Sequence, residues 1–395
     1  MEAYRVSNNR SPAVGITDSR VLREIRLNGR ISRVDIARNL NLNKSTVTKI
    51  VADLMERGVI KVVAEGDAGP QGGRKPKYLT LDSSFGCILG VEIRTDSWSA
   101  VAVDLHGRVL QSRDEPLTLD DTPILDVVVM VVESMRERVR ACGHRLIGVG
   151  LGLAGIIDHI DGIINQSYPL RVVDPIPVYE EASRRLGLPM FMDNDANCGC
   201  WAELAFPEIE RYENFVFVLG EVRLPKAGDF DDKSVSVGLG IVVGGSVHHG
   251  HDFSAGEFRS ILWRPGSRTQ FSITDIDASH IRDTPELQER MFRELSAHIA
   301  FLVNTLNLDH VVFGDTLGFT SEYVKRVCRE AIRENWSYST PVDCDIRISS
   351  LGERAVAYGA AGMFLEHLFA IPDASGFRQP RAGVHLLSEI QRAVR

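Results

Sequence analysis

The sequence lacks the long apolar runs and clustered cysteines that mark membrane and disulfide-bonded proteins. Its longest apolar run, around residues 124–132, is interrupted by Asp126 and is far shorter than the roughly 20 residues of a membrane span. The first ten residues are polar and carry no signal-peptide core. Six cysteines are scattered along the chain, and only Cys198 and Cys200 lie close together. We therefore expect a cytoplasmic protein without a membrane segment or a disulfide framework.

Acidic and basic residues are divided unequally along the 395-residue chain. The net charge is −8, yet residues 1–80 hold 15 Lys and Arg against 8 Asp and Glu, so the remainder is strongly acidic. The content of apolar residues, 44%, is ordinary for globular proteins, and the length suits two or three domains. A basic head in front of an acidic body predicts that the head, and not the body, meets a polyanion.

Residues 18–82 carry the pattern of a winged helix-turn-helix, preceded by an arm that we expect to be flexible over residues 1–17. Asp18, Ser32 and Asn43 are the expected helix caps, and Ser32 and Asp35 have the spacing of a capping box. A basic, glycine-rich loop joins two predicted strands and would form the wing. The helices are expected to begin at Asp18, Ser32 and Lys44, and the strands to cover residues 59–63 and 78–81.

The third helix, over residues 44–57, is the expected reader of DNA. Its apolar residues form one stripe, and the opposite face has short polar groups and cations with no acid before Asp53. Such residues near a helix N-terminus suit the major groove. The alternative is a three-helix bundle that contacts protein through a solvated basic face. The predicted DNA contacts are Lys44, Ser45, Thr46, Thr48 and Lys49 in the helix and Gly73, Arg74 and Lys75 in the wing.

The acidic body alternates strands and helices in an order that predicts an α/β fold with a mixed sheet. Five stretches of this body resemble motifs of the ROK family of repressors, open reading frames and kinases. They occur in the family's order and follow a winged helix, as in its repressors. The likeness covers nearly the whole chain and favours the repressor branch, which includes xylose-operon and N-acetylglucosamine repressors. The stretches are residues 151–158, 193–197, 237–245, 255–257 and 351–362.

This resemblance implies a sugar-kinase-like domain with the two-lobed, actin-like ATPase fold. The first lobe is expected to comprise residues 83–195 and 351–370, the second lobe residues 196–350, and a C-terminal tail residues 371–395. Residues 221–233 depart from the family and are expected to form an exposed loop.

The resemblance also assigns an effector cleft. Asp195 matches the catalytic base of the family's kinases, and Asn194 and Glu257 match residues that bind sugar hydroxyls. From the residues alone, Asn194 or Asp195 can equally cap the helix that follows. The expected effector-binding set is Asn194, Asp195 and Glu257.

Two departures from the family predict that the cleft does no chemistry. The kinases resemble one another in a first strand that ends Asp-x-Gly-x-Thr, whereas Glu92 and Arg94 stand at the Asp and Gly places here. The adenosine loop, a Gly-Gly pair in the kinases, reads Gly314-Asp315.

Ser260 takes the place of the histidine in the family's zinc motif, and we expect neither a metal nor a cofactor. The histidines at 248, 249 and 251 are expected to face solvent.

These observations predict a DNA-binding transcriptional regulator of carbohydrate genes, expected to be a repressor and not an enzyme. Its partners would be double-stranded operator DNA and a small carbohydrate effector that it does not phosphorylate, and it is expected to form a homodimer or homotetramer. Two alternatives stay open. One is an ATP-dependent sugar kinase with a regulatory DNA-binding head, and the other is a repressor whose sugar cleft is vestigial and which responds to a partner protein.

Overall fold

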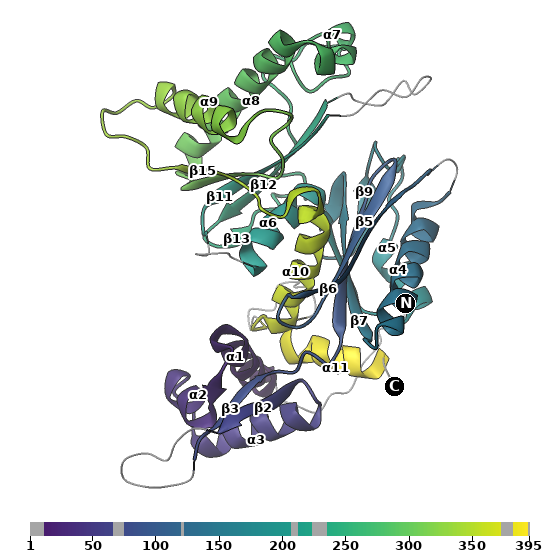
Figure 1. The fold of residues 1–395 in the computed structure, drawn as a ribbon, viewed down its shortest axis with the longest axis vertical. Coiled ribbons are helices and arrows are strands. Elements are labelled where there is room, and N and C mark those ends of the chain that lie inside the picture. Colours follow the sequence, from purple (N-terminus) through teal and green to yellow (C-terminus); the bar gives the residue numbers. More distant parts are fainter. Residues whose placement is uncertain are drawn as a thin grey trace.

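The computed structural model describes residues 12–65, 75–119, 122–206, 212–222, 235–372 and 382–393. An N-terminal head sits beneath a body of two lobes, and each lobe is built on a five-stranded sheet (Figure 1). No helix among the described residues is long and apolar enough to cross a membrane. The fold is therefore the mixed α/β architecture with an N-terminal winged helix that the sequence predicts.

The head is a winged helix-turn-helix with a three-stranded antiparallel sheet in the order β1-β3-β2. Ser32 caps the second helix by accepting a hydrogen bond from the Asp35 amide, as its spacing predicts. Asn43 stands at the cap position of the third helix, but its side chain makes no capping bond. The elements are α1 (Pro12–Asn28), β1 (Ile31–Ser32), α2 (Arg33–Asn39), α3 (Lys44–Glu56), β2 (Ile60–Glu65) and β3 (Lys77–Leu81).

The first helix begins earlier than predicted. It starts at Pro12, so residues 12–17 belong to α1 and not to a flexible arm, and Asp18 lies inside the helix. Proline suits the first turn of a helix, because its missing N–H would have no partner there. The predicted start at Asp18 is therefore wrong, and Pro12 is the local signal for the true start.

The first lobe carries a sheet in the order β10-β7-β4-β5-β6, covered by helices on both faces (Figure 1). The helices α4 and α5 cover one face, and α10 covers the other. A small hairpin, β8–β9, extends beyond the end of β7. The elements are β4 (Cys87–Ile93), β5 (Ser97–Val103), β6 (Val109–Pro116), α4 (Ile124–Ala141), β7 (Leu146–Leu153), β8 (Ile156–Asp158), β9 (Ile163–Gln166), α5 (Val178–Leu186), β10 (Met190–Asn194) and α10 (Ala355–Phe369).

The second lobe carries a sheet in the order β13-β12-β11-β14-β15, against which α8 and α9 pack. Helix α6 packs on α10 and also contacts β11 and β12, so it joins the two lobes. The elements are α6 (Asp195–Ala205), β11 (Phe215–Val222), β12 (Val235–Val243), β13 (Ser246–Val247), α7 (Asp275–Ser279), α8 (Pro285–Leu306), β14 (His310–Phe313), α9 (Ser321–Glu334) and β15 (Asp345–Ile348). Most of the segment predicted as an exposed loop, residues 221–233, lies outside the described residues.

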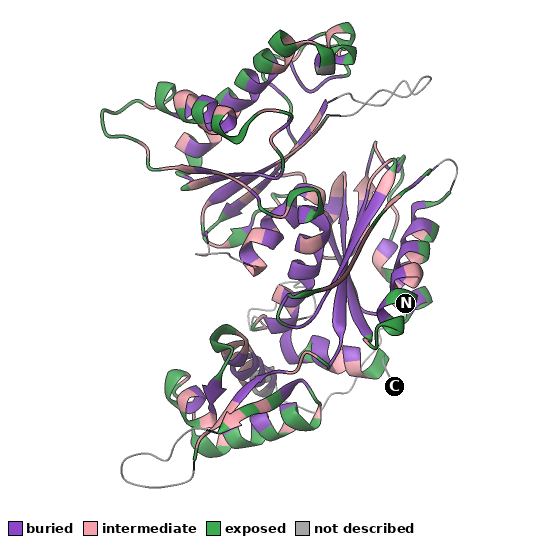
Figure 2. Ribbon diagram, in the orientation of Figure 1, coloured by how far each residue is buried: buried purple, intermediate pink, exposed green. Residues whose placement is uncertain are grey.

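Helix α10 runs through the centre of the body and is buried along most of its length (Figure 2). Glycines let it approach its neighbours at backbone distance. A Cβ atom on Gly90 of β4 would lie 1.8 Å from the Ala357 carbonyl oxygen, and one on Gly359 of α10 would lie 1.8 Å from the Cys198 carbonyl oxygen of α6. The helix is thus held between the sheet and α6 with no room for any side chain at these points.

The head and the body share one hydrophobic cluster. It joins α1 and α3 of the head to the C-terminal half of α10 and to a last helix, α11 (Gly383–Ala393). The described part of the expected tail, residues 382–393, is therefore a structural element at the junction of head and body and not a loose end. Members from these four helices include Val21, Leu22, Ile25, Val51, Leu54, Phe364, Leu365, Phe369, Leu386, Leu387 and Ile390.

The glycine contacts of α10 generate a first prediction. Gly90→Ala should lower the free energy of unfolding by about 3 kcal/mol or more, because its methyl group would overlap the Ala357 carbonyl. Gly238→Ala in β12 is the matched control, since a Cβ there meets no heavy atom closer than 3.4 Å. Urea unfolding of both variants measures the difference, and equal losses would contradict the account.

Candidate DNA interface and effector cleft

The predicted reading face of α3 is exposed, and its opposite face is buried (Figure 2). Thr46 is half-buried, and the Thr48 hydroxyl donates to the Lys44 carbonyl oxygen at 2.8 Å. Met55, which the sequence placed in the apolar stripe, is exposed. The exposed members of the predicted contact set are Lys44, Ser45, Thr48 and Lys49, and the buried stripe is Val47, Ile50, Val51 and Leu54.

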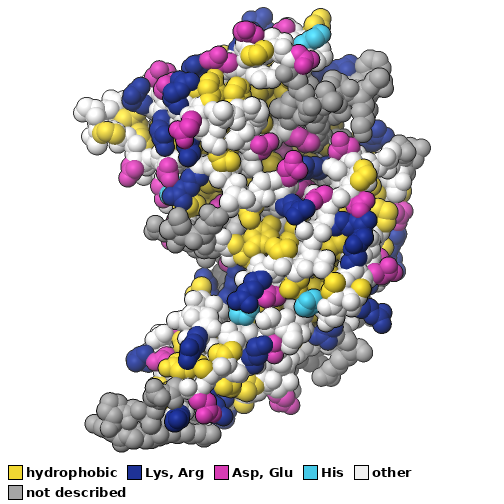
Figure 3. Space-filling model, in the orientation of Figure 1, with side chains coloured by type: hydrophobic (Ala, Val, Ile, Leu, Met, Phe, Trp, Pro, Cys, Tyr) yellow, Lys and Arg dark blue, Asp and Glu magenta, His cyan; other side chains and the backbone are white. Residues whose placement is uncertain are grey.

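The charge on α3 is arranged so that its N-terminal half stays positive. The first turn has no acidic residue, and Asp53 near the other end pairs with Arg57 at 2.9 Å. Lys and Arg side chains are also spread over the visible face of the head (Figure 3). In the wing, Lys75 is exposed, while Gly73 and Arg74 lie outside the described residues. Helix α3 therefore offers a polar, cationic end to a major groove.

Asn194 behaves as the cap of α6. Its side-chain oxygen accepts the Ala196 amide at 2.9 Å and the Asn197 amide at 3.4 Å, and its side-chain nitrogen donates to the Gly155 carbonyl at 3.0 Å. The alternative of a capping role thus describes Asn194. Its assignment to an effector stays a prediction.

Asp195 and Glu257 are brought to the same place from different parts of the chain. Asp195 is the first residue of α6, and its Oδ1 would lie 3.9 Å from a Cβ on Gly238. The exposed Glu257 pairs with Gly238 in an isolated antiparallel bridge. Gly238 therefore lies beside both predicted effector ligands, where β12 of the second lobe meets α6.

Arg94 directly follows β4, at the place where the resemblance to the ROK kinases implies a phosphate loop. Its guanidinium donates to both carboxylate oxygens of Glu92, at 2.7 and 3.1 Å, and to the Glu353 carbonyl oxygen at 3.1 Å. Burial raises the pKa of the Glu92 carboxyl to about 7, against the influence of Arg94, and the nearby Asp195 and Glu221 carboxylates add to the rise. The end of this strand is thus a pair of charged side chains and not bare backbone.

A cluster of histidines that the sequence analysis did not identify connects the two lobes. His249, from the loop after β13, bonds through Nε2 to Oδ2 of the buried Asp193 at 2.9 Å, and its ring stacks on that of His159 at 3.7 Å between centroids. Phe253 meets the His159 ring edge-on. The expectation that all three loop histidines face solvent is wrong for His249, because the fold supplies a buried carboxylate that no local pattern reveals.

The pKa values of three groups in this cluster are lowered, for different physical reasons. Burial would raise the pKa of the Asp193 carboxyl, but His249 outweighs it and holds this pKa at about 2. Burial lowers the pKa of the His159 ring to about 4, and that of His367, near the same carboxylate, also to about 4. The carboxylate is therefore ionised at neutral pH, while His159 and His367 are neutral.

No group of three or more His, Cys, Asp or Glu that could hold a metal ion occurs in the described part of the chain. Ser260, at the place of the zinc motif's histidine, is buried and accepts the Leu262 amide. The absence of a metal site stays a prediction.

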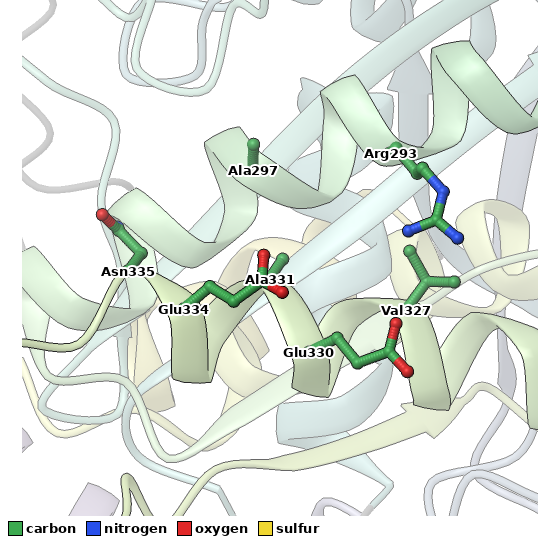
Figure 4. A pocket seen from close by; sticks show the side chains of 7 residues that line it. All are labelled: Arg293, Ala297, Val327, Glu330, Ala331, Glu334 and Asn335. Atoms are coloured by element: carbon green, nitrogen blue, oxygen red, sulfur yellow. The ribbon is translucent and has the colours of Figure 1, made fainter. Parts of the chain in front are cut away.

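A hollow of about 400 Å³ lies on the second lobe, between α8 and α9 (Figure 4). Arg293 and Glu330 face each other across it from the two helices (Figure 4). It contains none of the residues that the sequence predicts for the effector or for DNA.

Two families of known proteins match separate parts of the chain. Residues 88–265 match the ROK family, and residues 16–61 match a winged helix-turn-helix DNA-binding family. The chain carries a ROK family domain behind a winged helix-turn-helix. It is similar to the xylose repressor of Caldicellulosiruptor bescii, with 23% identity over 387 residues that cover 89% of this chain and 96% of the repressor.

Two further similarities frame the ROK domain. The glucokinase of Streptomyces coelicolor is 28% identical over 184 residues, covering 46% of this chain and 51% of the kinase. The crystal structure of a ROK family transcriptional regulator, a homologue of the Mlc protein of Escherichia coli, has a TM-score of 0.73. It is 20% identical and covers 97% of this chain and all of its own. This likeness shows that the chain, head included, shares the fold of that protein.

Two half-buried histidines, His159 and His367, predict acid sensitivity of the ROK domain. With pKa values of about 4 in the folded chain and about 6.5 in the unfolded chain, His159 and His367 bind protons only on unfolding between these pH values. The free energy of unfolding should therefore fall as the pH drops through this window, by about 1–2 kcal/mol per histidine at pH 5.

Urea unfolding at pH 7 and pH 5 measures this loss. His367→Phe keeps an aromatic ring against Phe191, on which His367 stacks, and should reduce the fall. His251→Ala, at an exposed position, is the control and should not change it. The same fall in His367→Phe as in the parent would contradict the assignment.

Proposed function

We propose that the chain is a sequence-specific DNA-binding transcriptional regulator of carbohydrate genes, of the repressor type, and that its ROK domain binds a small carbohydrate. The observation that carries the proposal is the pairing of an exposed, acid-free face on α3 with a ROK domain, in a chain that is similar to a xylose repressor over 89% of its length. The carbohydrate acts as an effector and is not a substrate.

Arg94 is the main argument against phosphoryl transfer. Glycine at such a loop lets backbone amides approach a phosphate, whereas Arg94 brings a side chain that is already bonded to Glu92 and to the Glu353 carbonyl. The nearby carboxylates of Asp195 and Glu221 add negative charge. Nucleotide phosphates would have to displace the arginine and approach these carboxylates.

A sugar can nevertheless be held without a nucleotide. The carboxylates of Asp195 and Glu257, two residues that both neighbour Gly238, can accept hydrogen bonds from sugar hydroxyls. Each charge-assisted hydrogen bond contributes about 1.5–3 kcal/mol. Because α6 and β12 belong to the region where the lobes meet, a bound sugar favours one arrangement of the lobes. In a homodimer or homotetramer this would change the spacing of two heads, which requires only that the sugar prefer one arrangement.

The kinase is the second candidate, because Asp195 is retained and because the glucokinase of Streptomyces coelicolor is similar over 46% of the chain. Incubation with ATP, Mg²⁺ and a panel of sugars that includes D-xylose, D-glucose and N-acetyl-D-glucosamine separates the two. We expect no sugar phosphate. Formation of a sugar phosphate by the parent, and its loss in Asp195→Asn, would show that the chain is a kinase with a DNA-binding head.

DNA reading by α3 is tested on the double-stranded sequence that the protein selects from a random pool. Lys44→Ala and Lys49→Ala should each weaken binding by about 5–150-fold, since a base-reading side chain contributes ~1–3 kcal/mol, and should relax the sequence preference. Arg264→Ala, which removes an exposed cation from the second lobe, is the control. Footprints like that of the parent in both α3 variants would remove this helix as the reader.

The cleft is tested through Asp195. Asp195→Ala should weaken the affinity for the sugar found in the panel by about tenfold to a hundredfold, at 1.4 kcal/mol per tenfold change, and should leave DNA binding intact. Asp174→Ala, an exposed carboxylate in the first lobe, should change neither. Calorimetry measures sugar binding and fluorescence anisotropy measures DNA binding. A sugar affinity like that of the parent in Asp195→Ala would favour the vestigial cleft.

A further inference from the structure

Helix α10 reaches from the cleft to the head. Its fifteen residues give it a length of about 22 Å. At its N-terminal end, the short 3₁₀ turn Gly352–Arg354 accepts the bond from Arg94 through the Glu353 carbonyl, and Gly359 touches the backbone of α6, the helix that begins with Asp195. At its other end, Leu365, Leu368 and Phe369 lie in the cluster shared with the head.

Arg26 of α1 contacts that end of α10. Its guanidinium pairs with Glu366 at 2.9 Å, donates to the Leu365 carbonyl at 3.4 Å and lies 4.7 Å from the centre of the Phe369 ring. The side chains of Arg26 and Glu366 are only 16% and 20% exposed, so water screens this pair less than a surface pair. The head is thus tied to α10 by charge and by a cation–π contact.

Helix α11 makes a second contact between the body and the head, and this contact extends to the end of α3. The Val384 amide donates to the Ser19 hydroxyl of α1 at 3.1 Å. Arg57, the residue that ends α3, donates to the Ser388 hydroxyl at 3.3 Å, and its carbonyl accepts from Gln391 at 3.4 Å. The end of the DNA-reading helix is therefore bonded to α11.

Helix α1 of the head, the end of α10 and the start of α11 meet at Gly383. A Cβ on this residue would lie 2.2 Å from the Ser19 hydroxyl of the head and 2.7 Å from the Ala370 carbonyl that follows α10. Its φ of +57° also favours glycine. Head, α10 and α11 thus touch at one point, with no side chain between them.

We propose that α10 and α11 form the element that couples the effector cleft to the DNA-reading helix, and that the Arg26–Glu366 pair is its contact with the head. Backbone contacts at Gly90, Gly150 and Gly359 leave α10 no space to bend. A shift of α6 against the first sheet therefore moves α10 as one body, and its far end carries α1 and α3 with it. This inference rests on the proposed function, in which a sugar changes the arrangement of the lobes.

The proposal makes Arg26 and Glu366 positioning residues that touch neither DNA nor sugar. In the parent, saturating sugar should change the affinity for the selected DNA by a coupling factor of about 5–150-fold. Arg26→Met keeps the aliphatic length but removes the charge, and Glu366→Gln keeps the shape. Both should reduce the coupling factor to about 3-fold or less. Neither should change the sugar affinity, or the DNA affinity without sugar, more than about 3-fold.

Arg293→Met is the matched control. It breaks an ion pair with Glu289, at 2.9 Å on the exposed surface of α8, and should keep the coupling of the parent. Anisotropy with and without the sugar gives the coupling factor, calorimetry gives the sugar affinity, and thermal unfolding shows that the variants are folded. A merely structural role of the pair would lower the melting temperature without changing the coupling factor.

The outcomes separate the two proposals. If no sugar in the panel changes DNA binding by the parent, the proposed function fails and this inference falls with it. If the parent responds and both variants respond equally, only the inference is overturned. If Arg26→Met does not fold, Glu366→Gln alone decides, because it removes a charge without a change of shape.

Discussion

The close approach of α10 to its neighbours is the constraint on which the rest of the structure depends. Gly90 and Gly150 on the sheet, and Gly359 on the helix, remove the side chains that would hold the backbones apart. This contact packs α10 directly between the first sheet and α6, and α6 begins with Asp195, at the predicted effector cleft. The same helix ends in the cluster that includes the head. The position of the predicted effector cleft relative to α3, the predicted DNA reader, is therefore set by this packing.

The electrostatics of the cleft follow from what stands at the end of β4. Bare backbone there would leave amides to meet an anion, but the Arg94–Glu92 pair uses the arginine internally and leaves the negative charges of Asp195 and Glu221 nearby. Such a surface favours neutral, hydroxyl-rich ligands over phosphates. The buried Asp193 carboxylate likewise has its partner within the protein, because it bonds to His249 of the other lobe. The end of β4 thus carries bonded side chains, and the predicted effector ligand Asp195 beside it is a carboxylate.

Local patterns predicted the head well. Capping by Ser32 and the stripe on α3 depend on residues a few positions apart, so the sequence contains them. Helix α9 also has such a pattern, in Val324, Val327, Cys328 and Ile332, and the start of α1 has Pro12. Other features have no local signal. Asp193 and His249 lie 56 positions apart in the sequence, and Arg26 and Glu366 lie near opposite ends of the chain. Only the tertiary structure therefore reveals these two contacts. The effector role of Asp195 and Glu257 came from family resemblance and is a prediction still.

The Arg26–Glu366 pair illustrates why a contact of modest energy can matter. Taking two charges partly out of water offsets most of their attraction, so such pairs contribute little net stability. They are directional, however, and an arginine that also lies over Phe369 and reaches the Leu365 carbonyl has one favourable position. The shared apolar cluster supplies the adhesion between head and body, and apolar surfaces can slide. The charged contact supplies the registry that the cluster lacks, so that a movement of α10 becomes a defined movement of the head.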